Sequence, residues 1–334
     1  MTGRKSVARR RRECVPSGAM ATLPPVATEE QLAAISRDEA VLRPGVERLC
    51  ALLRMNPDDL TRYPAGSRPV YAAGDLVLKL FPPVTGWPGQ RIEARVLAAA
   101  AGQLPIPTPR VHAAGTHDGW GYVLMSRLPG VPLDIAWDQV PAAGRNRLAR
   151  QLGEAIAALH RLPPPQVSDW QPGDWPAFVA GQRAQCVSEQ QALGLPALWA
   201  DQVPGFLDGV ALPSRPPVLL HTEVMRQHLL VTEDREGAWR LSGLIDFEPA
   251  MRGDREYEFV GVGVFVAGGD ARFFAQTLTS YGYQPDQLGP DLRRRLLALG
   301  ILHRYSNLSW WMQRLPEPAR PTLDALADCW FATS

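Results

Sequence analysis

The spacing of hydrophobic residues changes from helical to strand-like within the first third of the chain. Leucine, isoleucine and valine three or four positions apart predict a helix over 29–54, broken at Pro44-Gly45. Helical spacing returns over 89–101. Alternating residues predict a hairpin within 63–81 and strands around 110–114 and 122–127. The order strand, strand, helix, strand, strand predicts a small antiparallel β lobe with one helix against its sheet.

The remainder of the chain is mainly helical in pattern. Two short apolar strands, 218–220 and 229–231, enclose a polar loop. A Pro-Gly segment near residue 129 separates this part from the β lobe. We therefore expect an α+β fold with two lobes, over 26–128 and 129–334. Helices are predicted over 143–162, 174–193, 256–266, 270–281, 289–313 and 318–332.

Composition excludes several classes of protein. The chain has 334 residues, 46% of them hydrophobic, which is enough for two lobes. A net charge of +1 argues against a nucleic-acid partner, and no apolar run reaches the roughly 18 residues of a membrane helix. The four cysteines are scattered and lack metal-site spacing, as is typical of reduced thiols in a cytoplasmic protein. We expect a monomer or a dimer with no membrane partner.

The first residues are strongly basic. The run Gly3 to Cys14 carries six basic residues and one acidic residue, and no apolar stretch follows it. This pattern differs from that of a secretory signal. We interpret 1–25 as a disordered basic tail, or as an upstream extension if Met20 is the true start. A targeting arm or an arm that binds polyanions is the alternative.

Lysine is rare in this chain. Of 35 lysine and arginine residues only Lys5 and Lys79 are lysines, and Lys5 lies in the basic tail. A lysine is a compact ammonium on a slim stem, which suits phosphate contacts. Glu93 on the following predicted helix could pair with Lys79, although an exposed pair would contribute little. Gly66-Ser67 in the first turn could bring backbone N–H groups near a phosphate, but this is a weak signal.

Two acids each follow an apolar strand. Glu223 lies in the loop His221-Thr-Glu-Val-Met-Arg-Gln-His228, and Asp246 ends the run Leu-Ser-Gly-Leu-Ile-Asp. Such acids are usually turn or cap residues. Because a hairpin links these two, their side chains can also approach each other. One carboxylate would then accept a proton and the other would hold Mg²⁺, which prefers oxygen ligands.

This arrangement resembles that of protein kinases and their antibiotic-modifying relatives: a strand lysine, a helix glutamate, a hinge, a His-x-acid loop and Ile-Asp-Phe. The segments LGEAIAALHRL and LSGLIDFEPAMRGDREYEFV are most similar to the aminoglycoside phosphotransferase family, hygromycin phosphotransferases included. The similarity covers about residues 60–310. It implies a protein-kinase-like fold, with a nucleotide-binding lobe over 26–128 and a catalytic and acceptor-binding lobe over 129–334.

The resemblance also implies roles for individual residues, with ATP or GTP as co-substrate and Mg²⁺ as cofactor. Lys79 would hold the α- and β-phosphates, Glu93 would orient the lysine, and Asp246 would bind the metal. The stretch 125–128 would receive the nucleobase, and Asp254 would brace the catalytic loop. The expected nucleotide-binding residues are Lys79, Glu93, Gly66, Ser67, Ser126 and Leu128.

The loop departs from the family pattern His-Gly-Asp-x-x-x-x-Asn. His221 matches, but Glu223 replaces the catalytic aspartate and His228 replaces the metal-binding asparagine. A glutamate reaches about one ångström further, and imidazole favours softer ions than Mg²⁺. We expect Glu223 as the base, Asp246 and His228 at the metal, and Arg226 as a cation that stabilises charge on the γ-phosphate.

Three functions remain open. The favoured one is a kinase that phosphorylates a hydroxyl of a small-molecule acceptor and so inactivates an antibiotic, either an aminoglycoside such as hygromycin or a nucleoside antibiotic. The alternatives are a pseudokinase or nucleotide-binding module, and a different transfer reaction. The first is favoured because Lys79, Glu93, Glu223 and Asp246 all keep their charge.

Residues 130–334 carry 23 acidic and 18 basic residues, which is only mildly acidic, so a less basic acceptor is also possible. Arg252, Arg255 and Arg293–Arg295 are expected on the acceptor side.

Overall fold

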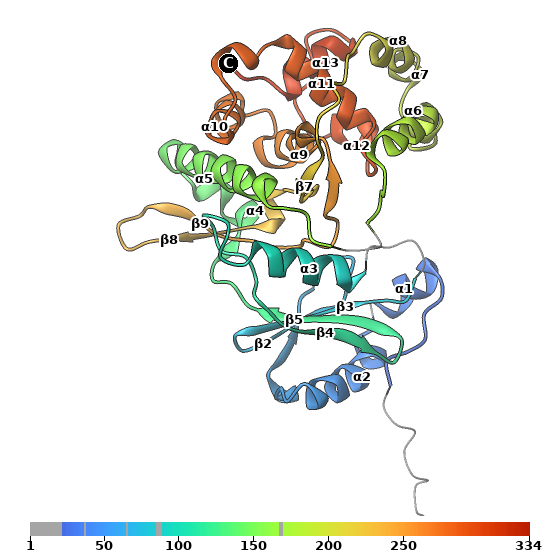
Figure 1. The fold of residues 1–334 in the computed structure, drawn as a ribbon, viewed down its shortest axis with the longest axis vertical. Coiled ribbons are helices and arrows are strands. Elements are labelled where there is room, and N and C mark those ends of the chain that lie inside the picture. Colours follow the sequence, from blue (N-terminus) through green and yellow to red (C-terminus); the bar gives the residue numbers. More distant parts are fainter. Residues whose placement is uncertain (1–21, 37, 65, 85–88, 167–169) are drawn as a thin grey trace, which may run out of the picture.

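The computed structural model describes residues 22–36, 38–64, 66–84, 89–166 and 170–334, which form two lobes (Figure 1). The first 21 residues of the expected basic tail lie outside the described residues. The N-terminal lobe contains a five-stranded antiparallel sheet in the order β1-β2-β3-β5-β4. Its strands are β1 (Leu60–Arg62), β2 (Val70–Ala73), β3 (Leu76–Phe81), β4 (Val111–His117) and β5 (Trp120–Ser126).

Helices pack on both faces of this sheet, where the sequence predicted one helix. The alternation of β3 explains the two faces, because Leu78 and Leu80 share a buried cluster with α2 while Phe81 belongs to the cluster that contains α3. Lys79 projects on the same side of β3 as Phe81, toward the C-terminal lobe. The helices of this lobe are α1 (Glu29–Ile35), α2 (Glu39–Leu52) and α3 (Gln90–Ala100).

The helix predicted over 29–54 is divided, but not at Pro44-Gly45. The division lies before Asp38, whose Oδ1 caps α2 by accepting hydrogen bonds from Ala40 N at 3.0 Å and Val41 N at 3.4 Å. Pro44 lies inside α2, where it removes a single backbone donor. Leu23, which the predicted boundary assigns to the tail, is buried against α2. A Cβ at Gly45 would lie 2.6 Å from the Leu23 nitrogen, so glycine is needed at this crossing.

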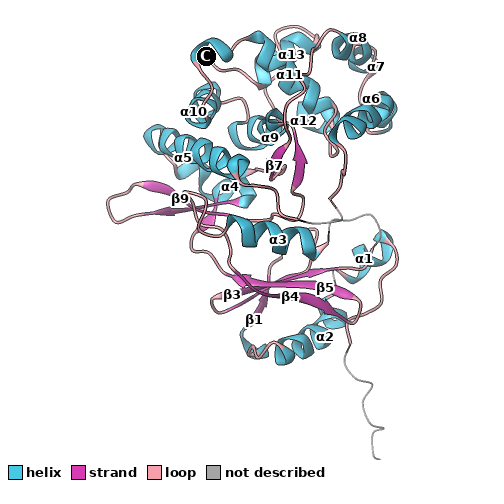
Figure 2. Cartoon of the chain, in the orientation of Figure 1, coloured by secondary structure: helices cyan, strands magenta, loops and turns pink. Residues whose placement is uncertain are grey.

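The C-terminal lobe is mainly helical (Figure 2). Two small sheets, β6-β8-β9 and β7-β10, lie on its side nearest the N-terminal lobe. No helix among the described residues is long and apolar enough to span a membrane. The strands are β6 (Val131–Pro132), β7 (Val218–Leu220), β8 (Leu229–Glu233), β9 (Trp239–Leu244) and β10 (Met251–Gly253). The α-helices are α4 (Leu133–Ala136), α5 (Ala142–Arg161), α6 (Trp175–Ala192), α7 (Ala197–Ala200), α8 (Val203–Asp208), α9 (Glu258–Gly261), α10 (Ala271–Tyr281), α11 (Pro290–Ile301), α12 (Leu308–Met312) and α13 (Leu323–Trp330).

The helix predicted over 289–313 is interrupted, and α11 and α12 are joined by a loop over 302–307. Buried side chains make the hydrogen bonds that the backbone of this loop would make within a helix. The hydroxyl of Tyr257 accepts a hydrogen bond from Arg304 N at 2.9 Å, and His303 Nδ1 accepts one from Tyr305 N at 3.2 Å. Gln190 Nε2 donates to the Ser306 carbonyl at 3.1 Å. Hydrophobic spacing gives no information about hydrogen bonds to distant residues such as Tyr257 and Gln190. It therefore predicted one continuous helix.

The buried imidazole of His303 predicts a pH dependence of stability. Its ring stacks on Tyr257 at 4.5 Å, and burial lowers the pKa of His303 to about 3. Below about pH 6.5 the unfolded chain binds a proton that the folded protein does not bind, so stability falls as the pH is lowered. From pH 6.5 to 5 this single group removes about 2 kcal/mol. We expect His303→Phe, which keeps the stacking, to flatten the decline by that amount in urea denaturation. Parallel declines for the two proteins would contradict the prediction.

Candidate active site at the junction of the lobes

The ammonium of Lys79 lies at the centre of a buried cluster of carboxylates. Its side chain is only 7% exposed, and Nζ lies 2.9 Å from Glu93 Oε2 on α3. The same atom lies 2.5 Å from Asp246 Oδ1 and 2.9 Å from Glu248 Oε2. Asp246 and Glu248 follow β9 in the C-terminal lobe, so the cluster joins the two lobes. Three residues that the sequence singled out, Lys79, Glu93 and Asp246, are therefore in contact.

The charges in this cluster are strongly coupled. Burial alone would lower the pKa of Lys79, but the charges of Asp246, Glu93 and Glu248 raise it well above the ordinary value. Burial raises the pKa of Glu93 to about 7, although Lys79 acts in the opposite direction. Burial would also raise the pKa of Asp246, but Lys79 and His228 hold it well below its ordinary value. Lys79 is therefore charged, and Glu93 is more readily protonated than Asp246.

Glu248 is a member of the site that the sequence reading missed. Its carboxylate accepts a hydrogen bond from Arg68 Nε at 3.1 Å, in an ion pair whose side chains are 11% and 3% exposed. Arg68 directly follows Gly66 and Ser67, so this pair ties the first turn of the N-terminal sheet to the C-terminal lobe. Glu248 stands two residues after Asp246, whose φ is 70°, so the chain turns here and does not continue as a strand. The available signal was a second acid close in the sequence to the expected metal ligand.

The loop from His221 to His228 connects β7 to β8 and is braced by a buried acid. Glu258, at the start of α9, accepts hydrogen bonds from His221 N at 2.6 Å and Thr222 N at 2.8 Å. The resemblance assigned this bracing role to Asp254. In the structure Asp254 instead pairs with Arg215 at 3.0 Å and caps the following turn. The brace is thus a glutamate four residues later along the chain.

Thr222 has an unusual backbone conformation. Its φ of 72° is rare for a β-branched residue, and the family pattern has glycine here. Thr222 Oγ1 donates to the Pro249 carbonyl at 2.9 Å and accepts from Arg304 Nη2 at 3.0 Å. These bonds, with those of Glu258, hold the conformation in place.

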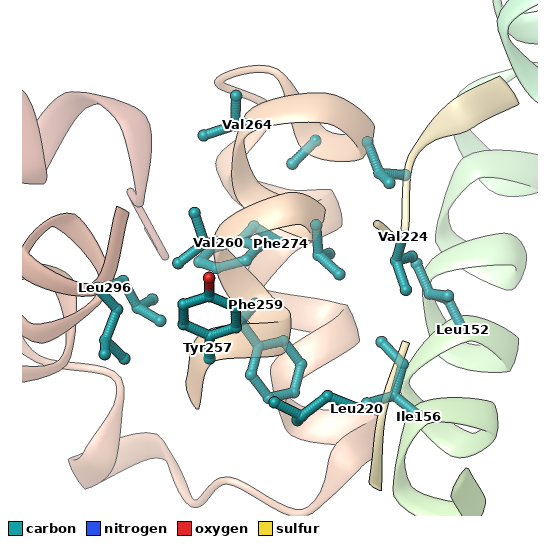
Figure 3. Close-up of a cluster of buried hydrophobic side chains, with 14 of the residues drawn as sticks. Leu152, Ile156, Leu220, Val224, Tyr257, Phe259, Val260, Val264, Phe274 and Leu296 are labelled. Atoms are coloured by element: carbon teal, nitrogen blue, oxygen red, sulfur yellow. The ribbon is translucent and has the colours of Figure 1, made fainter. Parts of the chain in front are cut away.

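The next part of the loop is anchored in the core. Val224 is fully buried and points toward Leu152 and Ile156 of α5 (Figure 3). A Cβ at Gly261 would lie only 3.2 Å from the Val224 carbonyl oxygen, so glycine lets α9 approach the loop backbone. Packing on one side and hydrogen bonds on the other therefore fix the position of Glu223.

Glu223, His228 and Asp246 lie together on the Asp246 side of the ion cluster. His228 Nε2 is 3.1 Å from Asp246 Oδ2, and His228 Nδ1 donates to the Glu223 carbonyl oxygen at 2.8 Å. Burial and Asp246 raise the pKa of Glu223, against the effects of His228 and Arg304. The Glu223 carboxylate makes no hydrogen bond to the described residues, so it can accept a proton from an incoming group.

The donor atoms also fit a divalent cation. One atom each from Glu223, His228 and Asp246 lie within 4.8 Å of one another. The site holds more acidic than permanently charged basic side chains, and a divalent ion would offset this negative excess. The acids are Glu93, Glu223, Asp246 and Glu248, and the bases are Lys79, Arg68 and Arg304.

His221 and Arg226 have supporting positions. The ring of His221 is buried, with Nε2 at 2.9 Å from the Ile245 carbonyl oxygen, and burial lowers its pKa to about 4. The guanidinium of Arg226 stacks on Trp137 at 3.6 Å, and Nε donates to the Val266 carbonyl at 2.9 Å. The structure therefore does not bring Arg226 to the carboxylates. The orientation of the Arg226 side chain depends on Trp137, which is far away in the sequence. It could therefore not be predicted from the sequence of the loop.

The remaining expected nucleotide-binding residues lie at the edges of the N-terminal lobe. Gly66, with φ of 117°, and Ser67 form an exposed turn beside a cavity of about 650 Å³ that α1 also lines. Ser126 ends β5, and its hydroxyl accepts a hydrogen bond from Arg110 N at 2.9 Å. The side chain of Leu128 packs against Gly243 of β9. Nucleotide contacts at these four residues stay predictions.

Comparison with known structures supports the kinase-like fold. Aminoglycoside phosphotransferase APH(2'')-Ib with bound ADP is 15% identical, with a TM-score of 0.52 over 86% of this chain and 98% of that one. The streptomycin–ATP complex of APH(2")-IIa is 14% identical, with a TM-score of 0.50 over 86% and 97%. A choline/ethanolamine kinase family protein from Mesorhizobium loti is 17% identical, with a TM-score of 0.50 over 77% and 83%.

The sequence profile of one family matches most of the chain. The match runs over residues 59–327 and so includes Lys79, the loop from His221 to His228 and Asp246. It begins at β1 and leaves out α1 and α2. The chain belongs to the phosphotransferase enzyme family.

Proposed function

We propose that the protein is a small-molecule kinase that transfers the γ-phosphoryl group of ATP or GTP to a hydroxyl group. The observation that carries the proposal is the Glu223 carboxylate, which is partly buried, has no hydrogen bond to the described residues and has a raised pKa. It stands beside Asp246 and His228, next to the buried ammonium of Lys79. A base beside a phosphate-binding lysine is what this reaction needs.

In the proposed reaction Glu223 accepts the proton of the acceptor hydroxyl as its oxygen bonds to the γ-phosphorus. The bond from the γ-phosphorus to the bridging oxygen breaks, and the nucleoside diphosphate leaves. Lys79 contacts the phosphates and Glu93 orients it. The transition state is loose, so these residues act by position and charge more than by covalent chemistry.

Asp246 and His228 are the residues that would hold Mg²⁺, with Glu223 beside them. When bound, the ion neutralises charge on the phosphates. Arg68 supports the same reaction as a second cation near the phosphates, and its ion pair with Glu248 holds it beside Lys79. Arg226 has no part in this proposal.

The acceptor is proposed as an antibiotic with a free hydroxyl group, whose phosphorylation would give resistance. The family and the two aminoglycoside phosphotransferases of similar fold support this class. Nucleoside antibiotics stay within the proposal because the cation Arg304 lies beside Glu223. A single cation at that point favours an acceptor that is less basic than a polycationic aminoglycoside.

The role of Glu223 as the base is tested by substitution. Glu223→Gln removes the proton acceptor while keeping the size of the side chain. We expect kcat to fall about 100-fold or more, with little change in the KM for ATP. The assay is product mass after incubation with ATP or GTP, Mg²⁺ and a panel of aminoglycosides and nucleoside antibiotics. Glu233→Gln, at an exposed position of β8, is the matched control and should behave as the wild type. Nucleotide binding without any product from the wild type would indicate a pseudokinase.

Glu223 and His228, which replace the family's aspartate and asparagine, are tested as a pair. If Glu223 and His228 are matched to each other, Glu223→Asp alone should lower kcat about 100-fold, because the carboxylate moves by about one ångström. His228→Asn alone should also lower kcat. The double variant, which restores the family residues, should lose less than the product of the two single losses. Strictly multiplicative losses would mean that the two residues act independently.

A further inference from the structure

The loop over 302–307 carries an arginine, Arg304, that bonds to the residue before the base and pairs with no carboxylate among the described residues. Arg304 Nη2 donates to Thr222 Oγ1 at 3.0 Å and also to the Pro249 carbonyl, and both acceptors are uncharged. Within the described residues no acid forms an ion pair with Arg304. Its charge is felt at Glu223, the next residue after Thr222. Arg304 is therefore an uncompensated cation beside the candidate base.

Three of the five arginines that the sequence placed on the acceptor side pair with acids. Arg293 pairs with Asp328 and Arg294 with Asp324, each at 3.0 Å. Arg295 pairs with Glu256 at 2.8 Å. Arg304 differs from these three because no acid among the described residues pairs with it, and it bonds to the residue before Glu223. Its charge is therefore available to a ligand bound at Glu223.

Tyr305 stands next to this cation. Its side chain is 47% exposed, and the Arg304 guanidinium lies 4.9 Å from the ring centroid. Burial raises the pKa of Tyr305, and the charges of Arg304, Glu223 and Glu248 also act on it. The phenol ring therefore lies within electrostatic range of the site and offers an exposed flat surface.

The backbone of this loop is held rigidly by buried polar side chains. Tyr257, His303 and Gln190 are 0%, 5% and 1% exposed, and each bonds to the loop backbone. Buried polar groups that order a surface loop are typical of binding sites, because a preorganised contact loses less entropy on binding.

We propose that Arg304 and Tyr305 form the acceptor-binding wall beside Glu223, and that the acceptor is a hydroxyl compound carrying a carboxylate. The proposal rests on the proposed kinase function. One uncompensated guanidinium matches one negative charge, so a monoanion suits the site better than a dianionic phosphate near Glu223 and Asp246. The flat part of the acceptor would stack on Tyr305.

The test compares two probes with the same ring and hydroxyl but opposite charges, 4-hydroxyphenylacetate and tyramine. Each is titrated into the full chain at low ionic strength, with Mg²⁺ and a non-hydrolysable ATP analogue, and the Kd is measured by calorimetry. We expect the anion to bind at least about 10-fold more tightly. Arg304→Gln should reduce this preference to less than about threefold, whereas Arg304→Lys should keep most of it. Tyr305→Ala should weaken both probes to a similar extent.

Arg240→Gln, at an exposed arginine of β9, is the matched control and should keep the full preference. Thermal melting of each variant shows whether it is folded. Equal or tighter binding of tyramine to the wild type, or a preference that survives Arg304→Gln, would overturn the proposal. The measurement needs no phosphoryl transfer. If the wild type prefers the anion but phosphorylates no acceptor, only the kinase function is contradicted. If it phosphorylates aminoglycosides but prefers tyramine, only this inference is contradicted.

Discussion

The buried ammonium of Lys79 is the constraint on which the arrangement of the two lobes depends. A buried charge is tolerated only when it is paired and hydrogen-bonded, and this one has three carboxylates within 2.9 Å. Glu93 comes from one lobe, and Asp246 and Glu248 come from the other. Moving the lobes apart would leave uncompensated charge on both sides, so the ion cluster fixes how the N-terminal lobe faces the loop from His221 to His228.

A second element, the helical segment over 258–267, positions that loop. Glu258 binds the amides of His221 and Thr222, and Gly261 allows the loop backbone to approach closely. Near the end of the segment, in a π-helical turn, the Val266 carbonyl accepts a hydrogen bond from Arg226. The loop is thus attached to a buried helix at its start, middle and end. This rigidity is what a catalytic carboxylate requires, because small errors of position are costly.

The sequence revealed the residues whose identity was itself unusual. Lys79 stood out because lysine is rare, and Glu223 and Asp246 because each ends an apolar strand; the α+β division followed from the change of hydrophobic period. Residues whose role depends on distant contacts were missed. Arg226 was expected at the phosphate, but its guanidinium stacks on Trp137. Arg304, which lies 81 residues after Glu223 in the sequence, acts on the charge of Glu223 instead. No local pattern encodes either contact, and the interruption of the helix at 302–307 depends on Tyr257 and Gln190 in the same way.

The departures from the family loop pattern form a physically connected set. Thr222 replaces glycine at a position with φ of 72°, and strain of this kind persists only when the surroundings hold it. Arg304, Pro249 and Glu258 provide that support. Thr222 in turn joins these residues to the candidate base, because it is the residue before Glu223. The departures at 222 and 223 and the arginine at 304 are therefore coupled through direct contacts, so a change at one of them would disturb the others.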